Sequence, residues 1–255
     1  IIMTYVGQKD LRLEIARGNI SGYDVVDKFG RNPDIDSGSG FEDVWDGGGT
    51  WVAPTTARTH DIVSTSTNDD GSPAGTGAQT ITIYGLDASG DEISESVTMN
   101  GTSNVATANT YTMIHRMAVT AAGSGGSNAG TITATAQTDA TVTAQINTGL
   151  NQTLMAIYQI PNNKIGYMTN YFCSFNNDPS GAAIIRLFVQ PNGEVFQTKH
   201  VIGVVSSGQG SVQHQFDPPL GDSVFDEFAI IKMQGNSDAD NSDISAGFSI
   251  IIIDK

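Results

Sequence analysis

The chain has 255 residues with 27 acidic and 12 basic side chains, so its formal net charge at pH 7 is -15. A field of this sign repels phosphate backbones and anionic lipid, which argues against direct nucleic-acid binding and against association with a membrane. Only 7% of the residues are aromatic and 15% are charged, while Gly, Ser, Thr, Asn and Ala are abundant, a composition that favours short strands and tight turns over long helices.

Targeting and redox signals are sparse. No apolar run approaches the roughly 20 residues that span a bilayer, and residues 1–15 mix charged with isolated apolar side chains, so no cleavable signal peptide is expected. The lone cysteine, Cys173, excludes an intrachain disulfide and a multi-cysteine metal site. A small buried thiol is the simpler interpretation of Cys173, and a reactive nucleophile is the alternative.

Residues 1–56 are predicted to form an extended N-terminal arm that ends in a Trp- and Gly-rich clasp. The segment 11–16, LRLEIA, alternates apolar and polar residues, which is strand spacing. Glycines and a proline between residues 18 and 40 then predict no further regular structure. Such a segment buries little by itself, so we expect it to lie against the body or another chain, with Tyr23 and Phe29 as interface anchors.

The clasp, residues 42–54, has the sequence EDVWDGGGTWVAP and holds both tryptophans. Its three consecutive glycines permit positive φ, so a sharp turn can bring Trp45 and Trp51 near one another. Two interpretations stay open: a pair of anchors in a local core, or a hot spot at a subunit interface, where Trp is over-represented. No lysine or helix start follows the glycines, so phosphate binding is not expected.

Residues 57–148 are predicted to form a first antiparallel β-sandwich. The turn DASGD predicts a hairpin between 80–86 and 92–99. His115 falls on a mostly apolar face of its strand and is interpreted as a satisfied interior or interface histidine, in preference to a ligand. The predicted strands are 60–66, 80–86, 92–99, 111–121, 131–136 and 141–146.

Residues 149–255 are predicted to form a second β-sandwich with a jelly-roll-like arrangement. The turn PNG at 191–193 is the clearest hairpin signal in the chain. The predicted fold is therefore all-β, an extended arm followed by two antiparallel sandwiches. The predicted strands of the second sandwich are 154–160, 165–175, 183–190, 194–205, 210–216, 227–235 and 245–254.

Patterns that could carry chemistry are weak. Asp34, Asp36 and Glu42 in one loop, and the DADNSD run at 238–243 in another, could hold Ca²⁺, although solvated acidic loops are the simpler interpretation. The four histidines fall on separate predicted strands without a nucleophile motif, and no carboxylate pair stands out. We therefore expect no enzymatic activity, no catalytic residue, no cofactor and no metal.

Several stretches, in order along the chain, resemble a family of tailed-bacteriophage virion proteins, often marine, of the capsid-decoration or head-fibre-like type. They are FGRNPDIDSGSGFEDVWDGGGTWVAP, QTITIYGLDASGDEISESVTMNG, AGSGGSNAGTITATA, GLNQTLMAIYQIPNNKIGYMTNY and DISAGFSIIIIDK, and the resemblance covers about residues 22–255. It implies a structural protein of the virion, located on the capsid surface and assembled in the cytoplasm of a bacterial host. No catalytic or ligand-binding residues come with it.

The resemblance implies a decoration or cement protein whose partners are the major capsid protein or other virion proteins, with a homotrimer as the expected oligomer. The alternative is a tail, baseplate or fibre component that binds a host surface glycan through loops such as 236–243. A depolymerising enzyme is a third, less favoured class.

Overall fold

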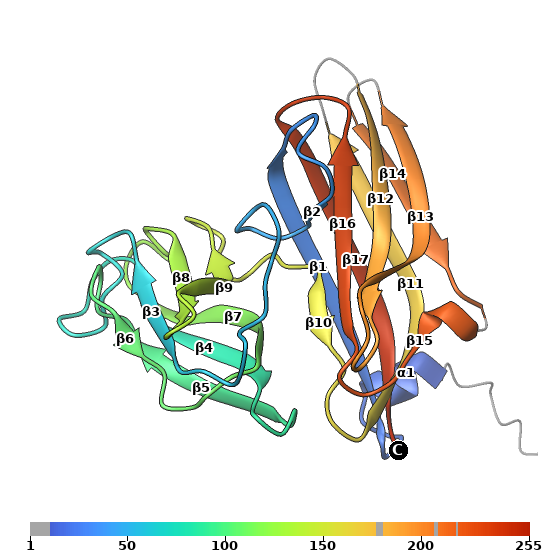
Figure 1. The fold of residues 1–255 in the computed structure, drawn as a ribbon. Helices are drawn as coiled ribbons and strands as arrows, with labels where there is room; N and C mark the ends of the chain where they lie inside the picture. Colours follow the sequence, from blue (N-terminus) through green and yellow to red (C-terminus); the bar gives the residue numbers. More distant parts are fainter. Residues whose placement is uncertain (1–10, 177–180, 207–208, 218) are drawn as a thin grey trace, which may run out of the picture.

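A computed structural model of the chain describes residues 11–176, 181–206, 209–217 and 219–255. The protein is almost entirely β, which confirms the all-β prediction (Figure 1). Its helical elements are the α-helix α1 (Leu11–Ala16) and the 3-10 turn η1 (Gly221–Ser223). Within the described ranges, no helix has the length and apolar character needed to cross a membrane.

The larger body consists of two antiparallel sheets that share one hydrophobic core (Figure 1). The first sheet has the order β1 (Tyr23–Ile35), β17 (Ser242–Asp254), β11 (Lys164–Asn176), β14 (Gln209–Gln215), and β15 (Val224–Phe225) also pairs with β11. The second has the order β10 (Ile157–Gln159), β16 (Ile230–Ser237), β12 (Gly181–Gln190), β13 (Gln197–Ser206), and β2 (Glu42–Asp43) also pairs with β16. Strand alternation fills the core, because Ile185 and Leu187 of β12 and Phe248 and Ile250 of β17 are all fully buried.

In both sheets an early strand lies beside a late one. β1 pairs with β17, and β2 and β10 both pair with β16. Neighbouring strands in these sheets are therefore far apart in the sequence. The ends of the described chain are thereby joined in one sheet, with Tyr23 opposite Ile253.

A smaller domain is inserted between β2 and β10, and its strands all fall within residues 57–148 (Figure 1). One sheet has the order β6 (Val105–Ala106), β3 (His60–Ser64), β8 (Ile132–Ala136), β9 (Thr141–Ile146), and the other β5 (Glu92–Thr98), β4 (Ala78–Leu86), β7 (Met113–Ala122). The predicted hairpin of β4 and β5 is confirmed, and β8 pairs with β9. A second hydrophobic core fills this domain.

The predicted N-terminal arm needs two corrections. Residues 11–16 form α1 and not a strand, because Leu, Arg, Glu and Ala all favour a helix and six residues are too few for alternation to decide. Residues 23–35 form the long strand β1, which supplies an edge of the larger body's first sheet. Residues 23–35 are therefore part of the larger body and not of an extended arm. The rest of the expected arm, residues 1–10, lies outside the described residues.

Gly30 and Pro33 mislead the sequence interpretation because each looks like a strand breaker. A Cβ at Gly30 would lie 2.2 Å from the Val44 carbonyl oxygen and 2.3 Å from the Ala156 nitrogen, so the glycine allows three backbones to meet. Pro33 sits where the register with β17 shifts, between Asn32 and Ile35, and an edge strand tolerates a missing N–H at such a bulge.

Candidate functional site

The clasp is a tight turn closed over Trp45. Gly48 and Gly49 have φ of +66° and +58°, the left-handed region that the sequence predicts for these glycines. Gly47 is required for a different reason, since a Cβ there would lie 2.3 Å from the Trp45 ring. The indole N–H of Trp45 donates to the Gly48 carbonyl at 2.8 Å and fixes the ring in the turn.

Asp43 anchors the clasp to the larger body and is fully buried. Its Oδ2 accepts the Trp51 backbone N–H at 2.7 Å and the Lys232 Nζ at 2.8 Å, and its Oδ1 accepts the Gln234 amide at 2.8 Å. A buried carboxylate is tolerated only with such a full set of partners. The clasp therefore connects the two domains through a charged network on β16.

Both tryptophans belong to the core of the inserted domain, with exposed fractions of 4% for Trp45 and 3% for Trp51. The Trp51 indole N–H donates to the Thr143 carbonyl of β9 at 2.8 Å. The structure therefore places them as anchors in a local core, and neither side chain is available to another chain. The two other expected interface residues stay accessible on β1, Tyr23 at 39% and Phe29 at 43%.

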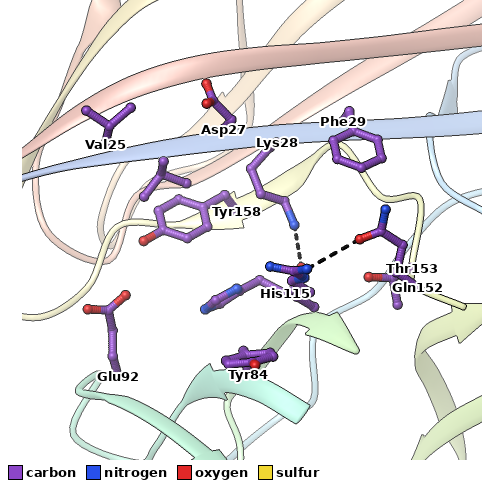
Figure 2. Close-up of a pocket in the computed structure, with 12 residues that line it drawn as sticks. Val25, Asp27, Lys28, Phe29, Tyr84, Glu92, His115, Gln152, Thr153 and Tyr158 are labelled. Carbon is purple, nitrogen blue, oxygen red and sulfur yellow. Dashed lines mark hydrogen bonds between the residues drawn. The ribbon is translucent and has the colours of Figure 1, made fainter. Parts of the chain in front are cut away.

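A cleft of about 320 Å³ separates the larger body from the inserted domain (Figure 2). β1 and β10 form one wall, and β4, β5 and β7 form the other. Figure 2 shows Lys28 and Tyr158 on one wall and Tyr84, Glu92 and His115 on the other. The ionisable and aromatic residues that line the cleft are Asp27, Lys28, Phe29, Tyr84, Glu92, His115, Arg116 and Tyr158.

Lys28 is the least expected residue of the cleft. Its side chain is only 9% exposed, and its Nζ donates to the backbone carbonyl of His115. No ion pair within the described residues includes Lys28. Burial, followed by repulsion from Arg116, lowers its pKa from 10.5 to about 7. Its inward position follows from strand parity, because Val26, Lys28 and Gly30 share a face of β1, but the sequence interpretation missed it by predicting no strand there.

Arg116 is the second cation of the cleft. Its guanidinium lies 5.6 Å from the centre of the Tyr84 ring and donates to the Gln152 side-chain oxygen at 3.4 Å. Among the described residues no carboxylate forms an ion pair with it. Arg116 and, when it is protonated, Lys28 thus face one cleft without a salt-bridge partner in the described ranges, in a chain whose net charge is -15.

Two buried polar atoms beside these cations have no hydrogen-bond partner within the described structure: Nε2 of His115 and the hydroxyl of Tyr158. Burial, and then the charges of Lys28 and Arg116, lower the pKa of His115 to about 3, so this ring is neutral at pH 7. The predicted interior position of His115 is correct, but the ring is not fully satisfied. Each such atom carries a desolvation cost of about 1 to 3 kcal/mol unless something binds it.

Glu92 supplies a carboxylate on the inserted-domain side of the cleft (Figure 2). Burial raises its pKa, Lys164 opposes that rise, and Asp24 adds to it. The cleft therefore carries cations near β1 and β7 and an acceptor group on β5, an arrangement suited to a polar ligand with a negative charge.

The two acidic loops considered for calcium lie side by side. The Asp36 carboxylate accepts the Asn241 backbone N–H at 3.0 Å, and Asp240 accepts the Ser37 hydroxyl at 2.6 Å. Asp243 pairs with Arg31 at 2.8 Å. Across the described ranges, no group of three or more His, Cys, Asp or Glu side chains is placed to hold a metal ion.

Three of the other candidates for chemistry, His200, His214 and Cys173, belong to the larger body. His200 and His214 stack with ring centres 4.3 Å apart, and the Tyr171 hydroxyl contacts the His200 ring nitrogen. Cys173 is buried, and burial raises its pKa to about 11, so it is a protonated thiol at neutral pH.

Comparisons with known proteins assign no family. No protein-family model matches the chain, and no curated protein matches it. Among solved structures, the chain is similar to infectious bursal disease virus VP2 in a subviral particle, with 8% identity over 99% of this chain and 76% of that chain and a TM-score of 0.20. The structure of the Gt strain of that virus gives 10% identity over 91% and 73%, with a TM-score of 0.20. At scores this low the likeness establishes no common fold.

Proposed function

We propose that the protein is a structural component of a bacteriophage virion, namely a trimeric decoration protein that stabilises the assembled head. The sequence motifs and their order support the virion assignment. The structural observation that carries an assembly role is an uncovered apolar strip on the outer face of β12 and β13.

This strip consists of Ile184, Val201 and Val205, with exposed fractions of 47%, 51% and 81%. Gly203 pairs with Ile184 across the two strands, and because it has no side chain, Ile184 borders both valines diagonally. β13 ends its sheet in the described strand order, so the strip lies along a sheet edge. Isolated proteins normally protect such edges with charge or cover them, and an exposed apolar edge indicates a contact surface.

A second copy of the chain is the occupant we assign to the strip. An edge strip that meets a different surface of its neighbour makes a head-to-tail contact, and when the rotation between neighbours closes, such contacts form a ring such as a trimer. The half-exposed Tyr23 on β1 then remains for contact with the capsid. Binding only the assembled shell would stabilise that state by mass action.

Charge substitutions in the strip test this assembly role. Val205→Lys should prevent trimer formation, measured by light scattering on the purified protein, and should reduce incorporation into particles. Val195→Lys is the matched control, because Val195 is also exposed but lies outside the strip in the turn before β13. A Val205→Lys protein that forms an oligomer of the same mass as the wild type and is incorporated into particles equally well would refute the assembly role. The cementing role fails if particles stripped of the protein survive heat and osmotic shock as well as intact ones.

The second candidate function is a tail, baseplate or fibre component that recognises a host surface glycan. The cleft between the domains favours it, whereas the loop 236–243 has Asp240 and Asp243 engaged by Ser37 and Arg31. Copy number separates the candidates: hundreds of copies per particle indicate the head, and a few tens or fewer indicate the tail.

A further inference from the structure

We propose that the cleft between the two domains is a binding site for an acidic sugar, whose carboxylate lies between Lys28 and Arg116. This inference goes beyond the structural role and does not depend on where the protein sits in a particle. It is based on the unpaired cations, the two orphaned polar atoms and the composition of the cleft walls.

The two cations of the cleft indicate the charge of its ligand. Lys28 is nine-tenths buried, makes one hydrogen bond to a neutral carbonyl, and lies near Arg116. Asp27 and Glu92 also line the cleft, but neither cation forms an ion pair within the described residues. A protonated Lys28 and Arg116 repel each other in a partly desolvated cleft, and an oxyanion between them favours the protonated lysine and forms a charge-assisted hydrogen bond with each cation. The ligand therefore carries a negative charge.

The unpartnered polar atoms of the cleft indicate a ligand with several hydrogen-bonding groups. Nε2 of His115 and the Tyr158 hydroxyl are buried against the cleft and unpartnered in the described structure. Glu92 and Gln152 offer further acceptors along the same walls. A ligand with several hydroxyl groups satisfies donors and acceptors of this kind together, whereas a simple inorganic anion would leave most of them unpaired.

The volume of the cleft and the aromatic residues at its border fit a small sugar. A cleft of about 320 Å³ is at the small end of the range for ligand sites, which suits one or two sugar rings. Phe29 and Tyr84 are half-exposed aromatic residues at its border, and such rings contact the apolar faces of sugars. Figure 2 shows them on opposite walls.

Calorimetric titration of the purified full chain with D-glucuronate, D-glucose and acetate tests the proposal. D-glucuronate should bind saturably. D-glucose, which lacks the carboxylate, and acetate, which lacks the hydroxyl groups, should each bind at least about tenfold more weakly. Lys28→Met should weaken D-glucuronate binding about tenfold or more, and Lys28→Arg should restore most of it. Lys199→Met is the matched control, since its Nζ pairs with Asp222 away from the cleft.

Absence of saturable D-glucuronate binding, or equal affinity of wild type and Lys28→Met, would overturn the site. Equal affinity for acetate and D-glucuronate would overturn the assignment of a sugar. Should Lys28→Met not fold, Tyr158→Phe deletes a single unpaired oxygen and should weaken binding severalfold, and unchanged affinity in that variant would also count against the site. A folded Lys28→Met protein should still be incorporated into particles. Loss of D-glucuronate binding can therefore be distinguished from loss of the structural role.

Discussion

Asp43 and Lys232 form an ion pair in which both side chains are buried, with Oδ2 and Nζ 2.8 Å apart. The pair joins the clasp to β16 of the larger body and lies beside the Trp51 backbone, which donates to the same oxygen. Because neither charge can reach water, each depends on the other. The attachment of the inserted domain therefore depends on an interaction between residues 189 positions apart.

Lys232→Met should lower the free energy of unfolding by about 3 to 5 kcal/mol, since it leaves the Asp43 charge buried without a cation. Urea denaturation measures the change. The double variant with Asp43→Asn should recover part of the loss because both charges are then gone. Lys199→Met breaks an ion pair with the exposed Asp222 and should cost less than about 1 kcal/mol. Equal costs for Lys232→Met and Lys199→Met would contradict the network.

Gly47→Ala should lower the free energy of unfolding by about 2 to 3 kcal/mol. The Cβ of the new alanine would lie 2.3 Å from the Trp45 ring, which is buried and hydrogen-bonded. Gly48→Ala is the matched control: its φ is +66° but no atom lies within 4 Å of the added Cβ, so only the backbone cost of about 1 kcal/mol applies. Tryptophan fluorescence should shift in the first variant and not in the second. The reverse order of costs would show that Gly47 is not packed against Trp45.

Local patterns were enough to predict the hairpin of β4 and β5, since both strands and the turn are contiguous in sequence. The strand β1 escaped prediction because its partner β17 lies at the far end of the chain, while Gly30 and Pro33 look like breakers. What makes them compatible with a strand, a close backbone approach and a bulge, exists only in the folded protein.

The candidate site was equally hidden. Lys28 contacts His115, which lies 87 residues away on another domain, so no spacing rule could bring them together. The tryptophans were found by composition, but sequence left open whether they face a core or a partner. Burial of the Trp51 ring against β9 is a tertiary fact. Residues on separate strands meet only through the order of the sheets.

Asp46 should make stability depend on pH in the acid range. Burial raises its pKa from 3.8 to about 6, against hydrogen bonds from Leu154 and Asn147. Between these two pH values the folded chain binds more protons than the unfolded chain. The contribution of Asp46 to the free energy of unfolding is therefore present below pH 3.8 and is lost as the pH rises through about 6. The loss is about 2 to 3 kcal/mol.

Asp46→Asn removes this titration. The unfolding free energy of the variant minus that of the wild type should therefore increase from about pH 4 to about pH 7, whatever its constant offset from altered hydrogen bonds. Urea denaturation at both pH values gives the difference, and other carboxylates cancel in the comparison. A difference that stays constant or decreases with pH would show that the pKa of the Asp46 carboxyl is not raised in the folded protein.

Trp51→Ala should unfold the inserted domain before the larger body, because the ring fills the inserted domain's core and its N–H bonds to Thr143. The expected cost is about 3 to 5 kcal/mol, whereas Trp51→Phe, which keeps most of the ring and loses the hydrogen bond, should cost about 1 to 2 kcal/mol. Hydrogen exchange resolves the two domains, and β3, β8 and β9 should lose protection while β11 and β17 keep theirs. Incorporation of Trp51→Ala into particles should fall in step with that local unfolding, because the buried ring cannot itself contact a partner. Wild-type protection of β9 in Trp51→Ala would show that the clasp does not hold the inserted domain together.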